Sequence, residues 1–128
     1  MAAEIPEKIT SFEQLYVWQN GQDLAVEVYK IVKSFPEDER FGLVSQLRRA
    51  SSSISANIAE GFGRRTTKDK AQFYFIANGS LLETKSHLYL AHKLGYITNE
   101  ELDSLKEQIT STHKLLNAFI KTVHEANY

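Results

Sequence analysis

The chain alternates long amphipathic stretches with short polar ones, and the apolar positions within each long stretch recur every three or four residues. That spacing places the apolar side chains on one side of an α-helix, whereas a half-buried strand alternates at every second residue. The pattern predicts helices over about residues 12–35, 40–61, 67–95 and 98–128. No stretch shows convincing two-residue alternation, so the sequence predicts an all-α fold.

The boundaries of these predicted helices carry start and stop signals. Ser11 and Thr98 are each followed three residues later by glutamine or glutamate, the spacing of a capping box. Pro36 ends the first helix because it cannot continue the backbone hydrogen-bond pattern. Gly61 and Gly63 are natural C-terminal stops for the second helix. All connections are short, which favours antiparallel neighbours and predicts an antiparallel up-down-up-down four-helix bundle.

Each predicted helix contributes one apolar stripe to the expected core. In the first helix the stripe is Trp18, Ala25, Val28, Val32 and Phe35. In the second helix it is Leu43, Leu47, Ala50, Ile54, Ile58 and Gly61. In the third helix it is Phe73, Ala77, Leu81, Leu88, Ala91 and Leu94. In the fourth helix it is Leu102, Leu105, Ile109, Thr112, Leu116, Phe119 and Val123.

Length and composition fit a single domain at 12–128 after an N-terminal tail at 1–11. The chain has 128 residues, 42% hydrophobic and 24% charged, which is typical of a globular protein. It has no cysteine, so disulfides and thiolate chemistry are excluded. No apolar run approaches the ~20 residues of a membrane span, and the first residues lack the pattern of a signal peptide. We expect a cytoplasmic protein without a membrane partner.

The third predicted helix carries a second apolar stripe nearly opposite its core side: Phe75, Leu82 and Tyr89. Three large apolar side chains in a line are normally shielded from water by another surface. Either the helix lies deep among its neighbours or the stripe is a subunit interface, and we expect the interface. On the side of the second helix away from its apolar stripe, the residues are all small: Ser45, Ser52, Ser55, Ala56 and Ala59. A small face on one copy receiving the stripe of another is a heterologous contact, which closes into a ring if the rotation allows.

Charge is unevenly distributed although the net charge is only -1. Residues 40–70 hold seven basic and two acidic residues, a net +5, whereas the remainder is net −6. Paired arginines beside a helix N-terminus suit phosphate groups, although a solvated basic turn explains the same pattern. The candidate nucleic-acid contacts are Arg48, Arg49, Arg64, Arg65, Lys68 and Lys70.

Asn57, Glu60 and Arg64 share one flank of the second predicted helix. Glu60 and Arg64 have the i,i+4 spacing of an ion pair. The cluster either presents Arg64 to a ligand or is a structural network that fixes the following turn. Both interpretations remain open from the residues.

Nothing in the sequence indicates an enzyme. Glu83 and His87 are four residues apart, but the Glu-x-x-His signature of di-iron bundles is absent, as are HExxH and a phosphate-cradling glycine loop. We therefore expect no catalytic residues, no metal and no cofactor.

The segments LRRASSSISANIAEGFGR and FYFIANGSLLETKSHLYLAHKLGYI resemble a known family. Its members are four-helix bundle proteins encoded by intervening sequences inside bacterial 23S ribosomal RNA genes. The chain is also similar to the accessory variability determinant of diversity-generating retroelements. The resemblance extends to Trp18, SFPEDERFGL and Gln46, and so covers nearly the whole chain.

The resemblance implies a ring-like homopentamer. For the retroelement relatives, which are strongly basic, it implies binding to nucleic acid and to a reverse transcriptase. The carried-over basic residues are Arg48, Arg49, Arg64 and Arg65. The carried-over polar motif is Asn57, Glu60 and Glu83. The leading hypothesis is a non-enzymatic oligomeric accessory protein that binds the backbone of RNA or DNA; the alternative is an oligomeric scaffold that binds a protein partner.

Overall fold

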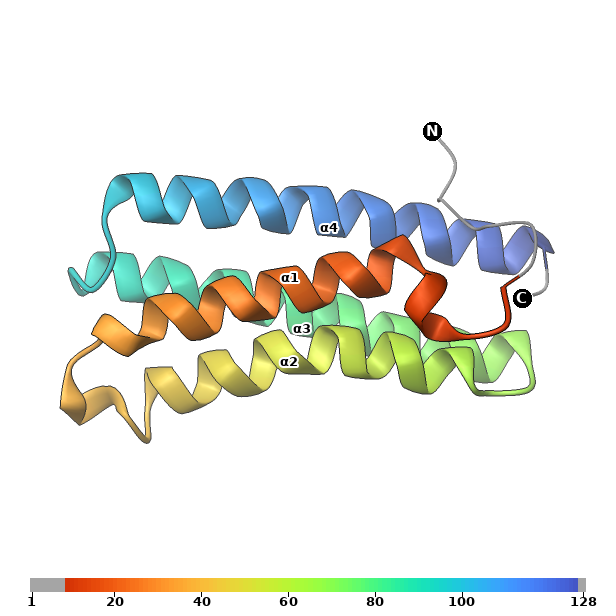
Figure 1. Cartoon of the computed structure of the whole chain (residues 1–128), viewed down its shortest axis with the longest axis horizontal. Coiled ribbons are helices and arrows are strands. Elements are labelled where there is room, and N and C mark those ends of the chain that lie inside the picture. The colour runs from red at the N-terminus through yellow and green to blue at the C-terminus, as the bar shows by residue number, and fades with distance from the viewer. Residues whose placement is uncertain (1–8, 127–128) are drawn as a thin grey trace.

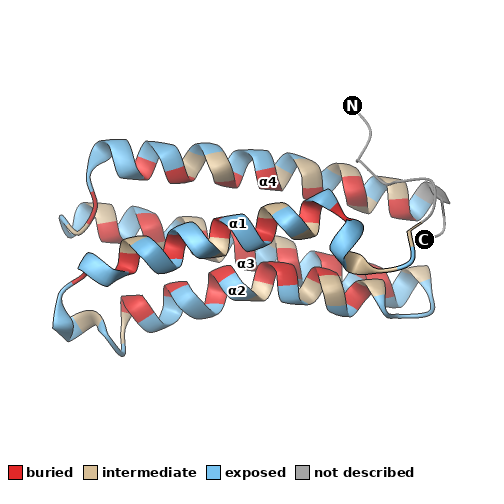
Figure 2. Ribbon diagram, viewed as in Figure 1, coloured by how far each residue is buried: buried red, intermediate tan, exposed pale blue. Residues whose placement is uncertain are grey.

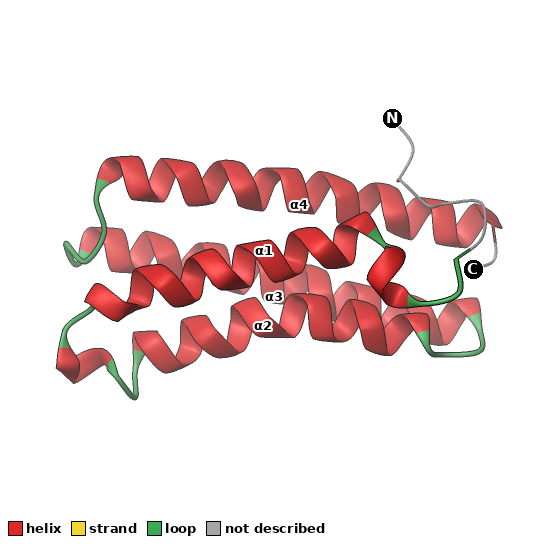
Figure 3. Ribbon diagram, viewed as in Figure 1, coloured by secondary structure: helices red, strands yellow, loops and turns green. Residues whose placement is uncertain are grey.

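The computed structural model describes residues 9–126, and side chains as far as residue 124. It contains four long helices: α1 (Tyr16–Ile31), α2 (Leu43–Phe62), α3 (Thr67–Lys93) and α4 (Asn99–Ala126). Short 3-10 turns lie at Phe12–Gln14, Val32–Ser34 and Glu37–Glu39. The described residues contain no strand, which confirms the predicted all-α, four-helix fold (Figure 3). Residues 1–8 of the predicted tail and residues 127–128 lie outside the described part.

The four helices lie side by side along the long axis of the molecule, and short connections join them at its ends (Figure 1). Each helix turns its buried residues inward (Figure 2). Every residue of the stripes predicted for the second and fourth helices is buried, which confirms the phase of both. Thr98 and Glu101 form the predicted capping box, with hydrogen bonds of 2.8 and 3.1 Å.

The first predicted helix is wrong in its extent and partly in its phase. Leu15 has extended backbone dihedrals, so the helix breaks after the 3-10 turn that Ser11 and Gln14 cap. Trp18 and Ala25 are only half-buried. The core side of α1 consists of Val17, Gly21, Leu24 and Val28.

The third predicted helix extends two residues too far at its end. α3 ends at Lys93, and Gly95 adopts a φ of +82°, a conformation that favours glycine. Leu94 is therefore exposed rather than in the core. At the other end, Tyr74 occupies the core instead of the half-buried Phe73, and its ring packs edge-on against Phe119 at 4.9 Å.

Small residues of α2 let its two neighbours approach closely. A Cβ on Gly61 would stand 2.7 Å from Cε1 of Tyr74, so only glycine fits beneath that ring. On the opposite side, Gly21 of α1 lies against Ser55, where an added Cβ would be 3.3 Å from the serine Cβ. Ser55 also accepts a hydrogen bond of 2.8 Å from the Gln22 side chain. Ser55 is thus buried inside the bundle and does not belong to the outer small face expected from the sequence.

Glu39 links the two connections at one end of the bundle. Its carboxylate accepts the Leu43 backbone N–H at 3.1 Å, which caps the start of α2. It also accepts the Tyr96 hydroxyl at 2.8 Å from the α3–α4 connection. The backbone hydrogen bond and then the Tyr96 hydrogen bond hold the pKa of Glu39 below its ordinary value.

Gly61→Ala should destabilise the protein by about 1–3 kcal/mol, because the new methyl overlaps the Tyr74 ring in a packed core. Gly79→Ala is the matched control, since nothing outside the local backbone of α3 lies within 4 Å of its Cβ position. The control should be neutral or stabilising by up to about 1 kcal/mol, because alanine is the better helix former. Chemical denaturation measures both, and equal free energies of unfolding for the two variants would contradict the close approach.

Glu39→Gln should flatten the dependence of stability on acid pH. Because the pKa of Glu39 is lowered in the folded state, its contribution is present above the ordinary value near 4.5 and is lost as the pH falls through the lowered pKa. The variant removes that titrating charge, so its urea midpoint should fall less between about pH 5 and pH 3 than that of the wild type. Glu107→Gln, at an exposed position of α4, is the control. Parallel curves for the wild type and Glu39→Gln would contradict the link.

Candidate nucleic-acid interface

Four of the six candidate basic residues lie in the turn between α2 and α3 or in the first turn of α3: Arg64, Arg65, Lys68 and Lys70. α2 ends at Phe62 and α3 begins at Thr67, after Thr66 caps the new helix by accepting the Asp69 N–H at 3.1 Å. Because a helix N-terminus exposes backbone N–H groups, this turn combines them with side-chain cations.

Arg64 is held in place by two contacts. Its guanidinium donates to Glu60 at 3.2 Å, which confirms the predicted i,i+4 pair. The same group lies 4.5 Å above the centre of the Phe73 ring. Arg64 remains exposed, so these contacts orient the cation without burying it. Both interpretations of the polar cluster are compatible with this geometry, because Glu60 both fixes the turn and aims Arg64.

Lys70 does not belong to the exposed basic set. It is 8% exposed, and its ammonium donates to the Phe62 carbonyl oxygen at 2.7 Å. Burial lowers the pKa of Lys70. A cation at the last carbonyls of a helix satisfies an unpaired acceptor and opposes the helix dipole. Lys70 is therefore a structural cap for the end of α2.

Arg65 and Lys68 are the exposed cations of this turn without an ion pair in the described part of the chain. They lie three residues apart and flank the cap at Thr66. Asp69 is the single acidic residue between positions 64 and 72. Arg65 and Lys68 are thus the groups most available to an anionic ligand at this end.

Arg48 and Arg49 lie well away from the turn. Thirteen helical positions separate Arg49 from Phe62 at the end of α2, a rise of about 20 Å at 1.5 Å per residue, and Arg64 lies beyond that end. The Arg48 guanidinium lies 5.4 Å above the Tyr29 ring of α1. Arg49 instead forms an ion pair with Glu83 of α3 and bonds Gln46 at 2.9 Å. The six predicted cations therefore form two separate groups and no continuous surface.

Glu83 is the centre of a polar seam between α2 and α3. Its carboxylate accepts from Arg49 and lies 3.1 Å from Nε2 of His87. Burial raises the pKa of Glu83, but hydrogen bonds and charge from His87 and Arg49 outweigh it, and the net shift is downward. Further along the same seam, Ser53 donates to Ser80.

The side chain of Asn57 forms its hydrogen bond within its own helix. Its side-chain amide donates to the Ser53 carbonyl oxygen at 2.7 Å. The sequence motif of Asn57, Glu60 and Glu83 is thus distributed along α2 and α3, with each side chain bonded to a different partner. The partner Ser80 was missed from the sequence, because pairing across the seam depends on the register of two helices. The Gln46–Arg49 bond was also missed, although its i,i+3 spacing within α2 is visible in the sequence.

The outer side of α3 keeps its second apolar stripe exposed in the single chain. Phe75 is 57%, Leu82 53% and Tyr89 38% exposed, so the alternative of a helix buried among its neighbours is wrong. Lys106 of α4 lies 5.3 Å above the Tyr89 ring. Ile76 and Leu90 extend the apolar area and were not expected from the sequence.

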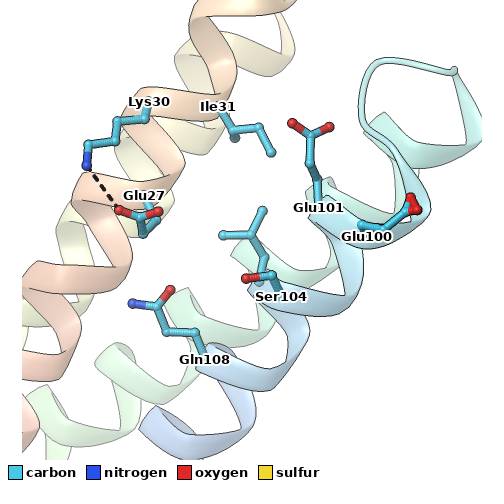
Figure 4. Close-up of a pocket in the computed structure, with 8 residues that line it drawn as sticks. Glu27, Lys30, Ile31, Glu100, Glu101, Ser104 and Gln108 are labelled. Atoms are coloured by element: carbon cyan, nitrogen blue, oxygen red, sulfur yellow. Dashed lines mark hydrogen bonds and ion pairs between the residues drawn. The ribbon is translucent and has the colours of Figure 1, made fainter.

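An acidic groove lies between the end of α1 and the start of α4, with a volume of about 430 Å³ (Figure 4). Its polar side chains come from both helices: Glu27 and Lys30 from α1, and Glu100, Glu101, Ser104 and Gln108 from α4. Glu27 pairs with Lys30 at 3.3 Å, and Glu101 is engaged in the helix cap. Its carboxylates disfavour phosphate, so this groove is no part of the candidate interface.

Neither a metal-ligand cluster nor a membrane-spanning helix occurs in the described part of the chain. Among these residues, no three histidine, aspartate or glutamate side chains are grouped as metal ligands. No helix between residues 9 and 126 is both long enough and apolar enough to cross a membrane.

Comparisons with known proteins agree with the fold. Residues 13–118 match the family described as 23S rRNA-intervening sequence protein. A crystal structure from Bacteroides thetaiotaomicron, described as a protein with unknown function from the S23 ribosomal protein family, is 31% identical with a TM-score of 0.73. The match covers 83% of this chain and 99% of that one. No curated protein matches the chain. The chain belongs to the 23S rRNA-intervening sequence protein family.

Proposed function

We propose that the protein is a non-enzymatic, cytoplasmic accessory protein that binds the phosphate backbone of RNA or DNA as a homo-oligomer. The observation that carries the proposal is the α2–α3 turn, where Arg65 and Lys68 have no ion pair in the described residues and Arg64 is oriented by Glu60 and Phe73. Contacts of this kind neutralise phosphates without reading sequence. The family name supports an RNA-related setting, and the resemblance to the retroelement determinant adds a reverse transcriptase as a proposed partner.

The oligomer is proposed from the stripe of Phe75, Leu82 and Tyr89, whose members are seven residues apart. Ser45, Ser52 and Ala59 of α2 repeat the same seven-residue spacing, and the two serines are exposed. Large side chains on one helix and small ones on another at equal spacing suit knobs-into-holes packing.

A contact between different faces is heterologous and closes into a ring if the rotation allows. We propose such a ring of antiparallel bundles. The count of five subunits rests on the family resemblance.

The second candidate function is an oligomeric scaffold for a protein partner. The acidic groove between α1 and α4 favours it, because acidic side chains lining the same groove as the apolar Ile31 and Leu105 suit a basic segment of a protein and repel nucleic acid. In the first function the α2–α3 turn binds phosphate groups, and in the scaffold function it does not. Nucleic-acid titration therefore distinguishes the two functions.

Leu82→Glu should dissociate the oligomer, because it places a charge in the middle of the apolar stripe. Light scattering at micromolar concentration should show monomers or smaller species for the variant. Ser111→Glu, at an exposed position of α4, adds the same charge as a control and should leave the size unchanged. A monomeric wild type would contradict the proposed assembly.

Arg65→Ala with Lys68→Ala should weaken binding to all nucleic-acid sequences alike. Binding should be strongest at low salt, and the removal of each phosphate contact should flatten the log–log salt slope by roughly 0.7 on a single strand. The control is Lys114→Ala with Lys121→Ala, which removes two exposed cations of α4. Titrations with labelled single and double strands at about 50 mM salt measure this effect, and absence of wild-type binding would leave the scaffold function.

A further inference from the structure

A second groove lies beside the basic turn and is not explained by backbone contacts alone. It runs between the first turns of α3 and the last turns of α4, has a volume of about 660 Å³, and is bounded by His124 on the α4 side. Three of its α3 residues, Lys68, Gln72 and Phe75, have the i,i+4,i+7 spacing that aligns side chains on one helix face. The groove therefore passes continuously from a cation to an amide to an aromatic ring.

The apolar part of this groove is unusually exposed. Phe75 is 57% and Ile76 52% exposed, although Ala71 and Tyr74 on the same turns are buried. Within the described residues, the Phe75 ring has no aromatic or cation–π partner, unlike Phe73, which Arg64 covers. An aromatic face that is open in a groove is suited to stacking by a flat apolar ring.

The cations beside the groove favour a ring that is joined to anionic groups. Lys68 lines the groove, and Arg65 precedes it by three residues at the cap of the same helix. Neither has an ion pair in the described residues, so both are available to an anion. The combination of a free aromatic face and adjacent free cations matches a nucleobase joined to phosphates.

We propose that this groove binds single-stranded nucleic acid, with a base stacked on Phe75 and the backbone phosphates on Lys68 and Arg65. Gln72, between them, presents both donors and an acceptor to the edge of the base. In a duplex the base faces are stacked against one another, so duplex nucleic acid lacks the group that Phe75 recognises. This inference rests on the proposed function and adds to it the strandedness of the ligand.

This site narrows the proposed subunit contact to Leu82 and Tyr89 and assigns Phe75, at the end of that stripe, to the groove. Leu82 lies seven residues further along α3, a rise of about 10 Å, so a contact centred on Leu82 and Tyr89 leaves Phe75 at its edge. The ring of Phe75 is then free to face the groove. A second copy of the chain covering Phe75 is the competing occupant, and the experiment below distinguishes the two.

The test uses fluorescence anisotropy of the full-length protein with three labelled probes of equal length: oligo-dT, an abasic strand with the same phosphates, and a duplex. Stacking of one base predicts that oligo-dT binds about 5- to 150-fold more tightly than the abasic strand. Phe75→Leu keeps an apolar side chain without an aromatic face, and it should abolish that difference. Phe75→Trp should retain it, and light scattering of Phe75→Leu should show the wild-type size.

The outcomes separate the inference from the function on which it rests. If none of the probes binds, the nucleic-acid function itself fails. If oligo-dT and the abasic strand bind the wild type equally, or if the duplex binds best, backbone binding stands and the stacking site is overturned. A smaller oligomer for Phe75→Leu, with the probe preference unchanged, also overturns it and assigns Phe75 to the subunit contact.

Discussion

The close approach of α2 to its two neighbours is the constraint on which the rest of the bundle depends. Gly61 admits the Tyr74 ring on one side, and the Gly21–Ser55 contact brings α1 close on the other. These approaches place Ser53 and Arg49 within hydrogen-bonding reach of α3, so the polar seam follows from the packing. A serine-rich helix loses helix propensity, but its short side chains give room for helices that larger residues would hold apart.

The basic turn is positioned by the same packing. Because Tyr74 packs beneath α2, the neighbouring Phe73 is only half-buried, and Arg64 stacks on its ring. Lys70 is drawn inward to the last carbonyls of α2, and only the remaining cations reach solvent. The division between structural and available cations therefore arises from how α2 ends, although all of them are equally basic in the sequence.

The sequence was sufficient for the fold class, for the apolar sides of α2 and α4 and for the exposed stripe on α3, since these depend on periodicity within one helix. It was insufficient where the outcome depends on neighbours. Lys70 has the spacing of a surface cation, and only the position of the Phe62 carbonyl shows that it is buried. Ser55 lies on the small side of its helix, and only the presence of Gly21 shows that α1 covers it. No proline or glycine marks the break at Leu15. The sequence therefore predicts one continuous helix through that position.

The hydrogen bond between Glu39 and Tyr96 has a consequence for the order in which the chain folds. It joins residues 57 positions apart and encloses α2 and α3 within the loop it closes. Closing so long a loop costs more chain entropy than closing either helix connection, so this bond forms after α2 and α3 have paired. The Leu43 amide, by contrast, donates to the other carboxylate oxygen of the same residue across only four positions, so its protection from exchange does not wait for the bundle to close. One carboxylate thus joins a bond that can form early within a turn to a bond that forms only when the two connections at this end of the bundle meet.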